Sequence, residues 1–155
     1  MASIIAMVKT RLSPTRRIQS DIQKMYRARN KGSILLAKLI NNRIYYRYNC
    51  CIAIHSDIDP SVLFPHPVGV VIGEGVVVGP GCTVYQNVTL GLKKLDQNLY
   101  PRLEEHCIVY AGACVFGNCL IRRGTTIAAG TVVMDLNCEE DDLLVGMPAR
   151  SKKKA

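Results

Sequence analysis

Aliphatic residues recur at every sixth position through the second half of the 155-residue chain, at Leu103, Val109, Val115, Ile121, Ile127 and Val133. This spacing fits neither an amphipathic helix, whose apolar period is 3.6 residues, nor a strand, whose period is two. A period of six indicates three short faces per turn of a coil, with one side chain of each face pointing inward. The pattern therefore predicts a β-solenoid built from hexapeptides.

Two further slots of each hexad obey their own rule. The fourth slot holds residue types that tolerate a left-handed backbone, as expected where a coil turns a corner: His106, Gly112, Asn118, Gly124 and Gly130. The fifth slot is small: Cys107, Ala113, Cys119, Thr125 and Thr131. Both rules support the solenoid and predict which side chains fill its narrow interior.

The same register continues upstream, with aliphatic or aromatic residues opening the hexads at Ile52, Ile58, Phe64, Ile72, Val78, Val84 and Leu90. It is interrupted twice. Eight residues separate Phe64 from Ile72, and thirteen separate Leu90 from Leu103, which predicts a loop over 92–101. Interruptions of a solenoid form loops, often on the binding face, so we expect the functional site at these two breaks.

Two helices are expected before the coils. Residues 18–30 place Ile18, Ile22, Met25 and Tyr26 on one side, after a loose basic arm over 1–17. Residues 33–48 form the second helix, with Ser33 as N-cap and an apolar set of Leu35, Leu36, Leu39, Ile40 and Ile44. We therefore expect a mainly β fold of three parts: a basic helical segment (1–50), the β-helix (51–138) and a closing segment with a basic tail (139–155).

Charge is concentrated in the first part. Residues 1–50 hold eleven Lys or Arg and a single acid, Asp21, whereas the remainder holds nine basic and eleven acidic residues. Such a segment suits a solvated cap, contact with an anionic membrane surface, or nucleic acid. No aromatic stacking platform or nucleic-acid motif accompanies it, so no nucleic-acid partner is expected. With no membrane-length apolar run and no secretory signal, we expect a cytoplasmic protein, with the inner membrane face as an option.

Seven cysteines raise the question of disulfides or zinc. Their number is odd and no CxxC pair occurs, while Cys82, Cys107 and Cys119 fall in the small fifth slot. We therefore expect packing roles, no metal site, and free thiols that fit a reducing compartment.

Of the three histidines, His66 is the candidate for chemistry. His55 and His106 occupy fourth, corner slots, where a structural role suffices. His66 lies in the first register break between Pro65 and Pro67, which stiffen the backbone around it. A rigidly presented imidazole suits a general base. Outward aromatic residues at Tyr85, Tyr110 and Phe116 indicate a subunit interface, and a homotrimer is the natural closed assembly for a triangular prism.

Five segments together resemble the serine-acetyltransferase-like group of hexapeptide-repeat acyltransferases. They cover much of residues ~50–151, and are Phe64 to Gly73 (FPHPVGVVIG), Gln86 to Gly91 (QNVTLG), Tyr100 to Leu103 (YPRL), Ala111 to Ala113 (AGA) and Val145 to Arg150 (VGMPAR). The resemblance implies a left-handed parallel β-helix, a homotrimer, and acetyl-CoA as co-substrate in the groove between adjacent prisms, with no permanently bound cofactor.

By the same resemblance His66 is the catalytic base that deprotonates an acceptor hydroxyl. Small residues let the thin pantetheine arm approach the backbone, and basic residues near the C-terminus suit the CoA phosphates. The implied cofactor-binding residues are Gly91, Ala111, Gly112, Ala129, Arg150 and Lys152.

The chain departs from serine acetyltransferases at two positions. Tyr100 stands in place of a second histidine, and Cys51 in place of the acid that steadies the catalytic histidine, with Asp57 and Asp59 as candidate substitutes. Because a tyrosine face suits stacking on a sugar, the leading expectation is O-acetylation of a sugar or surface-polysaccharide precursor, with Tyr100, Asp57 and Asp59 at the acceptor. Serine O-acetylation is the alternative. A metal-dependent hydratase, which needs three converging histidines, and a non-catalytic trimeric scaffold are further readings.

Overall fold

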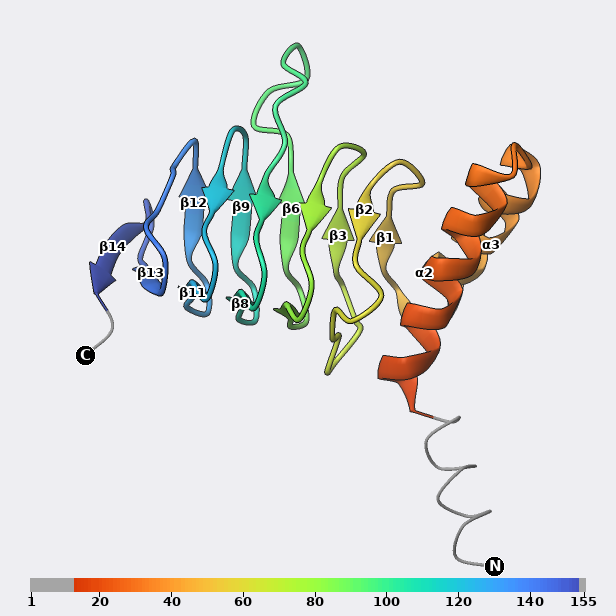
Figure 1. Ribbon diagram of the computed structural model, residues 1–155, viewed down its shortest axis with the longest axis horizontal. Coiled ribbons are helices and arrows are strands. Elements are labelled where there is room, and N and C mark those ends of the chain that lie inside the picture. Colours follow the sequence, from red (N-terminus) through yellow and green to blue (C-terminus); the bar gives the residue numbers. More distant parts are fainter. Residues whose placement is uncertain (1–12, 154–155) are drawn as a thin grey trace, which may run out of the picture.

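The computed structural model describes residues 13–153, and side chains as far as residue 150. Two helices precede a prism of stacked coils, α2 (Pro14–Asn30) and α3 (Ile34–Tyr48), and they cover its N-terminal end (Figure 1). The rest of the chain winds through three sheets, which we call A, B and C. This is the arrangement of a left-handed parallel β-helix, and it confirms the predicted fold class.

Successive strands of one coil belong to different sheets. Sheet A contains β1 (Cys51–Ile52), β3 (Val71–Ile72), β6 (Thr89–Gly91), β9 (Cys114–Phe116) and β12 (Val132–Met134). Sheet B contains β2 (Asp57–Ile58), β4 (Val77–Val78), β7 (Arg102–Leu103) and β10 (Leu120–Ile121). Sheet C contains β5 (Thr83–Val84), β8 (Ile108–Val109), β11 (Thr126–Ile127), β13 (Asp142–Val145) and β14 (Arg150–Lys153). All pairings are parallel except that of β13 with β14.

The six-residue rule places the core as predicted. The aliphatic residue that opens each hexad is buried, as at Leu103, Val109 and Val115, and so are the fifth-slot residues from Cys107 to Thr131. Strand residues alternate between an outward and an inward side chain, so each two-residue strand contributes one side chain to the interior. The prism is therefore filled by a column of aliphatic side chains with small residues at its corners.

The corner prediction holds at most positions and fails at three. His106 has a φ of 58° and Gly112, Gly124 and Gly130 lie near 65–69°. Among the described residues, His55, Gly75 and Asn118 are not in the left-handed region, and Gly117 takes that conformation in place of Asn118. The exceptions share the edge between sheets A and B, where the coils turn through a different backbone path. A left-handed backbone therefore does not explain why a histidine occupies position 55.

The helices differ from expectation in start and in packing. Helix α2 begins at Pro14 rather than residue 18, with proline in the first turn, where its missing N–H costs nothing. Residues 1–12 of the expected arm lie outside the described residues. Ser33 is the N-cap of α3 but its hydroxyl makes no capping bond. Helix α3 packs through Ala37, Ile44 and Tyr48, and it leaves most of its predicted apolar set exposed: Leu35, Leu36 and Leu39.

Polar contacts fix α2 to the first coil. The side-chain amides of Gln19 and Gln23 donate to the carbonyls of Asp59 and Ile58, at 2.7 and 3.0 Å. The Arg29 guanidinium donates to the carbonyls of Ile54 and Ser56. These bonds satisfy backbone acceptors at the open end of the prism, where no further coil is stacked.

The sheets also extend beyond the expected end of the β-helix at residue 138. Strand β13 pairs in parallel with β11, and Leu144 fills the interior beside Ile127. Strand β14 then pairs with β13 in the antiparallel direction and covers the C-terminal edge of sheet C. Within residues 13–153 no helix is both long enough and apolar enough to cross a bilayer.

Candidate active site

His66 is displayed by a short, well-anchored loop on the edge where sheet C leads to sheet A, which we call the C–A edge. Phe64 and Val70 are fully buried on either side of the loop, and Pro67 is buried within it. The Val68 N–H donates to the His66 carbonyl at 2.8 Å, and the Gly69 N–H donates to the Asn49 carbonyl. The backbone is thus fixed while the imidazole is exposed, as a general base for an external substrate requires.

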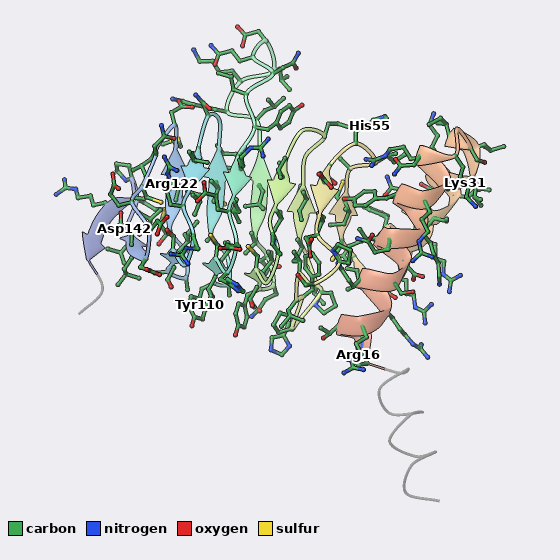
Figure 2. The ribbon with its side chains drawn as sticks, in the orientation of Figure 1. Arg16, Lys31, His55, Tyr110, Arg122 and Asp142 are labelled. Atoms are coloured by element: carbon green, nitrogen blue, oxygen red, sulfur yellow. The ribbon has the colours of Figure 1, made fainter. Side chains whose placement is uncertain are left out.

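Aromatic rings line the same edge beside His66. The His66 and Tyr85 ring centroids are 6.3 Å apart, and Tyr85 stacks on Tyr110 at 5.1 Å with an interplanar angle of 19°. Figure 2 shows Tyr110 along the lower edge of the prism. In the described part of the chain no hydrogen bond or ion pair involves the His66 side chain, so no acid of the same chain orients it.

Small residues continue the C–A edge beyond His66. The Gly112 N–H donates to the Gln86 carbonyl and the Gly130 N–H donates to the Ala111 carbonyl, both at 3.0 Å, which stacks the corners of successive coils. Ala111, Gly112 and Ala129 therefore follow one another along this edge, as their predicted role as a pantetheine strip requires. Arg150, paired with Val145, begins β14 at the far end, and Lys152 pairs with Leu143 in the same strand.

Four other predicted site residues lie elsewhere on the same chain. Asp57 and Asp59 belong to the sheet B region, the face opposite the C–A edge, so neither steadies the His66 of its own chain. The Asp59 carboxylate instead accepts the N–H and hydroxyl of Ser61, at 2.8 and 2.5 Å. Gly91 and Tyr100 flank the loop at the edge between sheets A and B, the A–B edge. These four residues lie away from His66 because each hexad advances the chain to the next face of the prism.

Tyr100 lies over a glycine turn of the preceding coil. A Cβ atom added to Gly75 would overlap the Tyr100 ring, and one added to Gly73 would lie 3.5 Å from it. Half-buried, the ring also packs against the core cluster. Tyr100 therefore holds the end of the 92–101 loop against the prism in addition to any contact with substrate.

The other end of the loop is held by charge. The Lys93 ammonium pairs with the Asp135 carboxylate, which also accepts the Asn118 N–H at 2.9 Å. The neighbouring Lys93 lowers the pKa of Asp135, and the Asn118 N–H lowers it further. The loop stands out from the upper edge of the prism between β6 and β7, on the opposite side from Tyr110 (Figures 1 and 2).

Sequence reasoning did not single out Gln86 as a site residue. Register places it one coil beyond His66 on the C–A edge, and its side-chain carbonyl oxygen is buried with no hydrogen-bond donor in the described structure. A buried acceptor without a donor is costly, and Gln19 and Thr131 each carry another such atom among the described residues. No sequence pattern reports such an unsatisfied atom.

The cysteines occupy mostly interior positions. Cys50, Cys82, Cys107, Cys119 and Cys138 are buried, Cys114 is half-buried, and Cys51 is exposed at the start of β1. The Cys82 thiol donates to the Glu104 carbonyl at 2.9 Å and that of Cys107 to the Arg122 carbonyl at 3.1 Å. Burial raises the pKa of Cys119, which makes its thiolate unavailable. Across residues 13–153 no three His, Cys, Asp or Glu side chains gather in an arrangement able to hold a metal ion.

A hollow in the described part of the chain lies away from His66. It measures about 750 Å³ and lies between α2 and sheet B, where Arg29, Arg102 and Arg123 face Asp57, Glu104 and Glu140. Mixed charges of both signs on an open groove give no preferred ligand. We therefore place the candidate active site at the C–A edge, where the candidate general base His66 lies, rather than in this groove.

Known proteins resemble both the sequence and the fold. The serine acetyltransferase of Buchnera aphidicola is 32% identical over 123 residues, which cover 78% of this chain and 44% of that protein. A serine acetyltransferase solved in complex with CoA superposes with a TM-score of 0.78 at 28% identity, covering 85% of this chain and 54% of that one. The chain is similar in both sequence and fold to serine acetyltransferases.

A second solved structure extends the likeness. Soybean serine acetyltransferase complexed with serine matches with a TM-score of 0.79 at 28% identity, over 85% of this chain and 54% of that one. No protein-family model matches the chain. The chain spans about half the length of the relatives it matches. All three relatives are named serine acetyltransferases, so they support the likeness but not the expected polysaccharide branch.

Proposed function

We propose that this protein transfers the acetyl group of acetyl-CoA to a hydroxyl group, with His66 as general base. One observation carries the proposal: an exposed histidine on a fixed loop stands at the head of a small-residue strip that follows the same edge toward Arg150. The likeness to a serine acetyltransferase solved with CoA supports acetyl-CoA as the donor.

The proposed reaction needs no covalent enzyme intermediate. His66 takes the proton of the acceptor hydroxyl as its oxygen attacks the thioester carbonyl carbon. Backbone N–H groups stabilise the tetrahedral oxyanion. The carbon–sulfur bond then breaks, CoA leaves as a thiolate that takes the proton back from His66, and an acetyl ester remains. Cysteine nucleophiles have no part in it, in keeping with the burial of most thiols.

A neighbouring copy completes the site in this proposal. His66 lies on the C–A edge and the loop with Tyr100 on the A–B edge, and both edges border sheet A. The outward strand residues of sheet A are uncharged: Cys51, Val71, Thr89, Cys114, Phe116, Val132 and Met134. If three prisms stand side by side with sheet A facing a threefold axis, each C–A edge lies beside the A–B edge of the next copy. A homotrimer thus brings Tyr100 of one copy toward His66 of another.

Serine is the first acceptor to test, because the relatives are named serine acetyltransferases and the soybean protein was solved with serine. A sugar hydroxyl is the second candidate. Two observations favour it: Tyr100 offers an aromatic ring where serine acetyltransferases have a second histidine, and Cys51, which stands at the position of their acid, is exposed and uncharged. A compact amino-acid substrate needs charged partners that these residues do not supply.

The test follows thiol release from acetyl-CoA with L-serine or with a panel of monosaccharides and oligosaccharides. We expect His66→Asn to lower turnover by about 10²–10⁴-fold while CoA still binds. His106→Asn is the matched control, because it removes an imidazole from another edge and asparagine tolerates the left-handed φ of 58° found there. Full activity of the His66→Asn protein with its best acceptor would refute the proposed base.

A further inference from the structure

Helix α3 presents an apolar stripe to solvent on the side opposite its buried one. Ala37, Ile44 and Tyr48 face the core, whereas Leu35, Leu39 and Tyr46, four and seven residues apart, share the opposite side. These three side chains are 73%, 57% and 84% exposed. The exposed Asn42 lies between Leu39 and Tyr46 on this side, and exposed apolar groups gathered on one helix side mark an interaction surface.

Basic side chains flank this stripe on both sides. Helical spacing puts Lys38 on one side, and Arg43 and Arg47 on the other. Arg43 and Arg47 also line a hollow of about 250 Å³ between the helices, together with Arg17, Ser20, Asp21 and Lys24. The stripe, its flanking cations and this hollow form one continuous region, which we call the cap surface.

The single acid of the two helices, Asp21, lines the hollow but is almost fully buried, and its carboxylate lies 3.9 Å from the Arg43 guanidinium. Residues 14–50 contain nine Lys or Arg and only Asp21 as a counter-charge. Asp21 is 5% exposed, and its carboxylate accepts the Tyr48 hydroxyl at 3.1 Å and the Lys24 ammonium at 3.4 Å. The exterior of both helices is therefore neutral or cationic throughout.

We propose that the cap surface docks on an anionic lipid bilayer. Leucine and tyrosine side chains suit the boundary between headgroups and acyl chains, and each flanking Lys or Arg adds attraction to anionic headgroups. A second copy docked face to face would place cations against cations. Nucleic acid would match the charge but would leave the central leucines without a partner.

The position of the cap surface suits this role. The two helices lie at one end of the prism, beyond β1, and β14 lies at the other end (Figure 1). The side-by-side trimer proposed above would present three cap surfaces in the same direction. Three weak attachments to one bilayer act together, which strengthens binding without any new contact.

The experiment mixes the full chain with sedimenting vesicles of phosphatidylcholine alone or with about a third phosphatidylserine. We expect binding only to the anionic vesicles, weaker at high salt because screening removes the headgroup attraction. The double variant Leu39→Gln/Tyr46→Gln should bind about tenfold less or weaker still, because the inserted apolar groups are gone. Leu95→Gln, which changes another leucine that is 95% exposed, is the matched control and should bind as the parent does.

Three outcomes would overturn the proposal. One is a parent protein that stays in the supernatant with anionic vesicles. Another is equal binding by the double variant and the Leu95→Gln control. The third is a loss of oligomer mass in the double variant without vesicles, which would assign the cap surface to a second copy. Thermal unfolding of both variants checks that each is folded.

Discussion

Tyr100 shows how one backbone position sets the place of a candidate site residue. Its ring occupies the space that a side chain at Gly75 would need. Gly75 is not left-handed, so glycine is required there for space rather than for backbone conformation. The contact holds the end of the 92–101 loop where the proposed trimer needs it.

Gly75→Ala should therefore destabilise the fold by about 1–3 kcal/mol, because the new methyl overlaps the ring. Gly91→Ala is the control, since a Cβ added there meets nothing within 4 Å. Urea unfolding measures the free energy of unfolding of both variants. In a Tyr100→Ala background the cost of Gly75→Ala should largely vanish, and a cost that persists would mean that the ring is not the obstacle.

The ion pair at Asp135 acts on the other end of the same loop. Because Lys93 lowers the pKa of Asp135, the folded value lies below the unfolded one. The pairing then stabilises the fold at pH values above the ordinary aspartate pKa, and this contribution is lost as pH falls through the lowered value.

Carbon-detected NMR of the carboxyl groups gives the direct measurement. We expect Asp135 to titrate below the ordinary aspartate range, and Lys93→Gln to raise its pKa back toward that range. Lys94→Gln removes an equal charge from the same loop without breaking the ion pair and should have the smaller effect. Equal shifts in the two variants would contradict a specific role for Lys93.

At the scale of elements, the junction between α2 and the first coil depends on a buried polar contact. The Tyr26 and Ser56 hydroxyls are 2.8 Å apart, and Tyr26 is 6% exposed. Burial raises the pKa of Tyr26 to about 12, because the phenolate would lose its hydration. The neutral hydroxyl is thus favoured in the folded state.

This raised pKa predicts a loss of stability in alkali. The stabilisation is fully present below the unfolded tyrosine pKa near 10 and is lost as pH rises toward 12, so the free energy of unfolding should fall by about 1 kcal/mol between pH 9 and 11. Tyr26→Phe should remove that part of the pH dependence. Tyr46→Phe, at a position 84% exposed, should leave it unchanged. Denaturant unfolding at the two pH values measures the free energy of unfolding of each protein.

At the scale of the whole molecule, the single chain separates the residues of its proposed site. His66 and Tyr100 occupy different edges of the prism, and the unsatisfied Gln86 oxygen lies on the edge with His66. Assembly is therefore part of the proposed chemistry.

Mixing two inactive variants tests whether neighbouring copies share one site. His66→Asn and Tyr100→Ala chains, unfolded and refolded together, should recover about one quarter of the parent activity per site, since that fraction of trimer sites pairs an intact His66 with an intact Tyr100 of the next copy. Each variant refolded alone is the control. A mixture no more active than the separate proteins would place both residues in one chain's site.

The amino-acid sequence was enough to predict the fold, because a six-residue rule constrains the interior positions of a prism and most of its corners. The break in that rule also singled out His66, held between two prolines, as the candidate general base, and this role stays a prediction. The positions of Asp57 and Asp59 on another face, and the exposure of Leu35 and Leu39, became apparent only in the folded chain. Both depend on which face of an element meets which neighbour, and a periodic pattern carries no information about the neighbour.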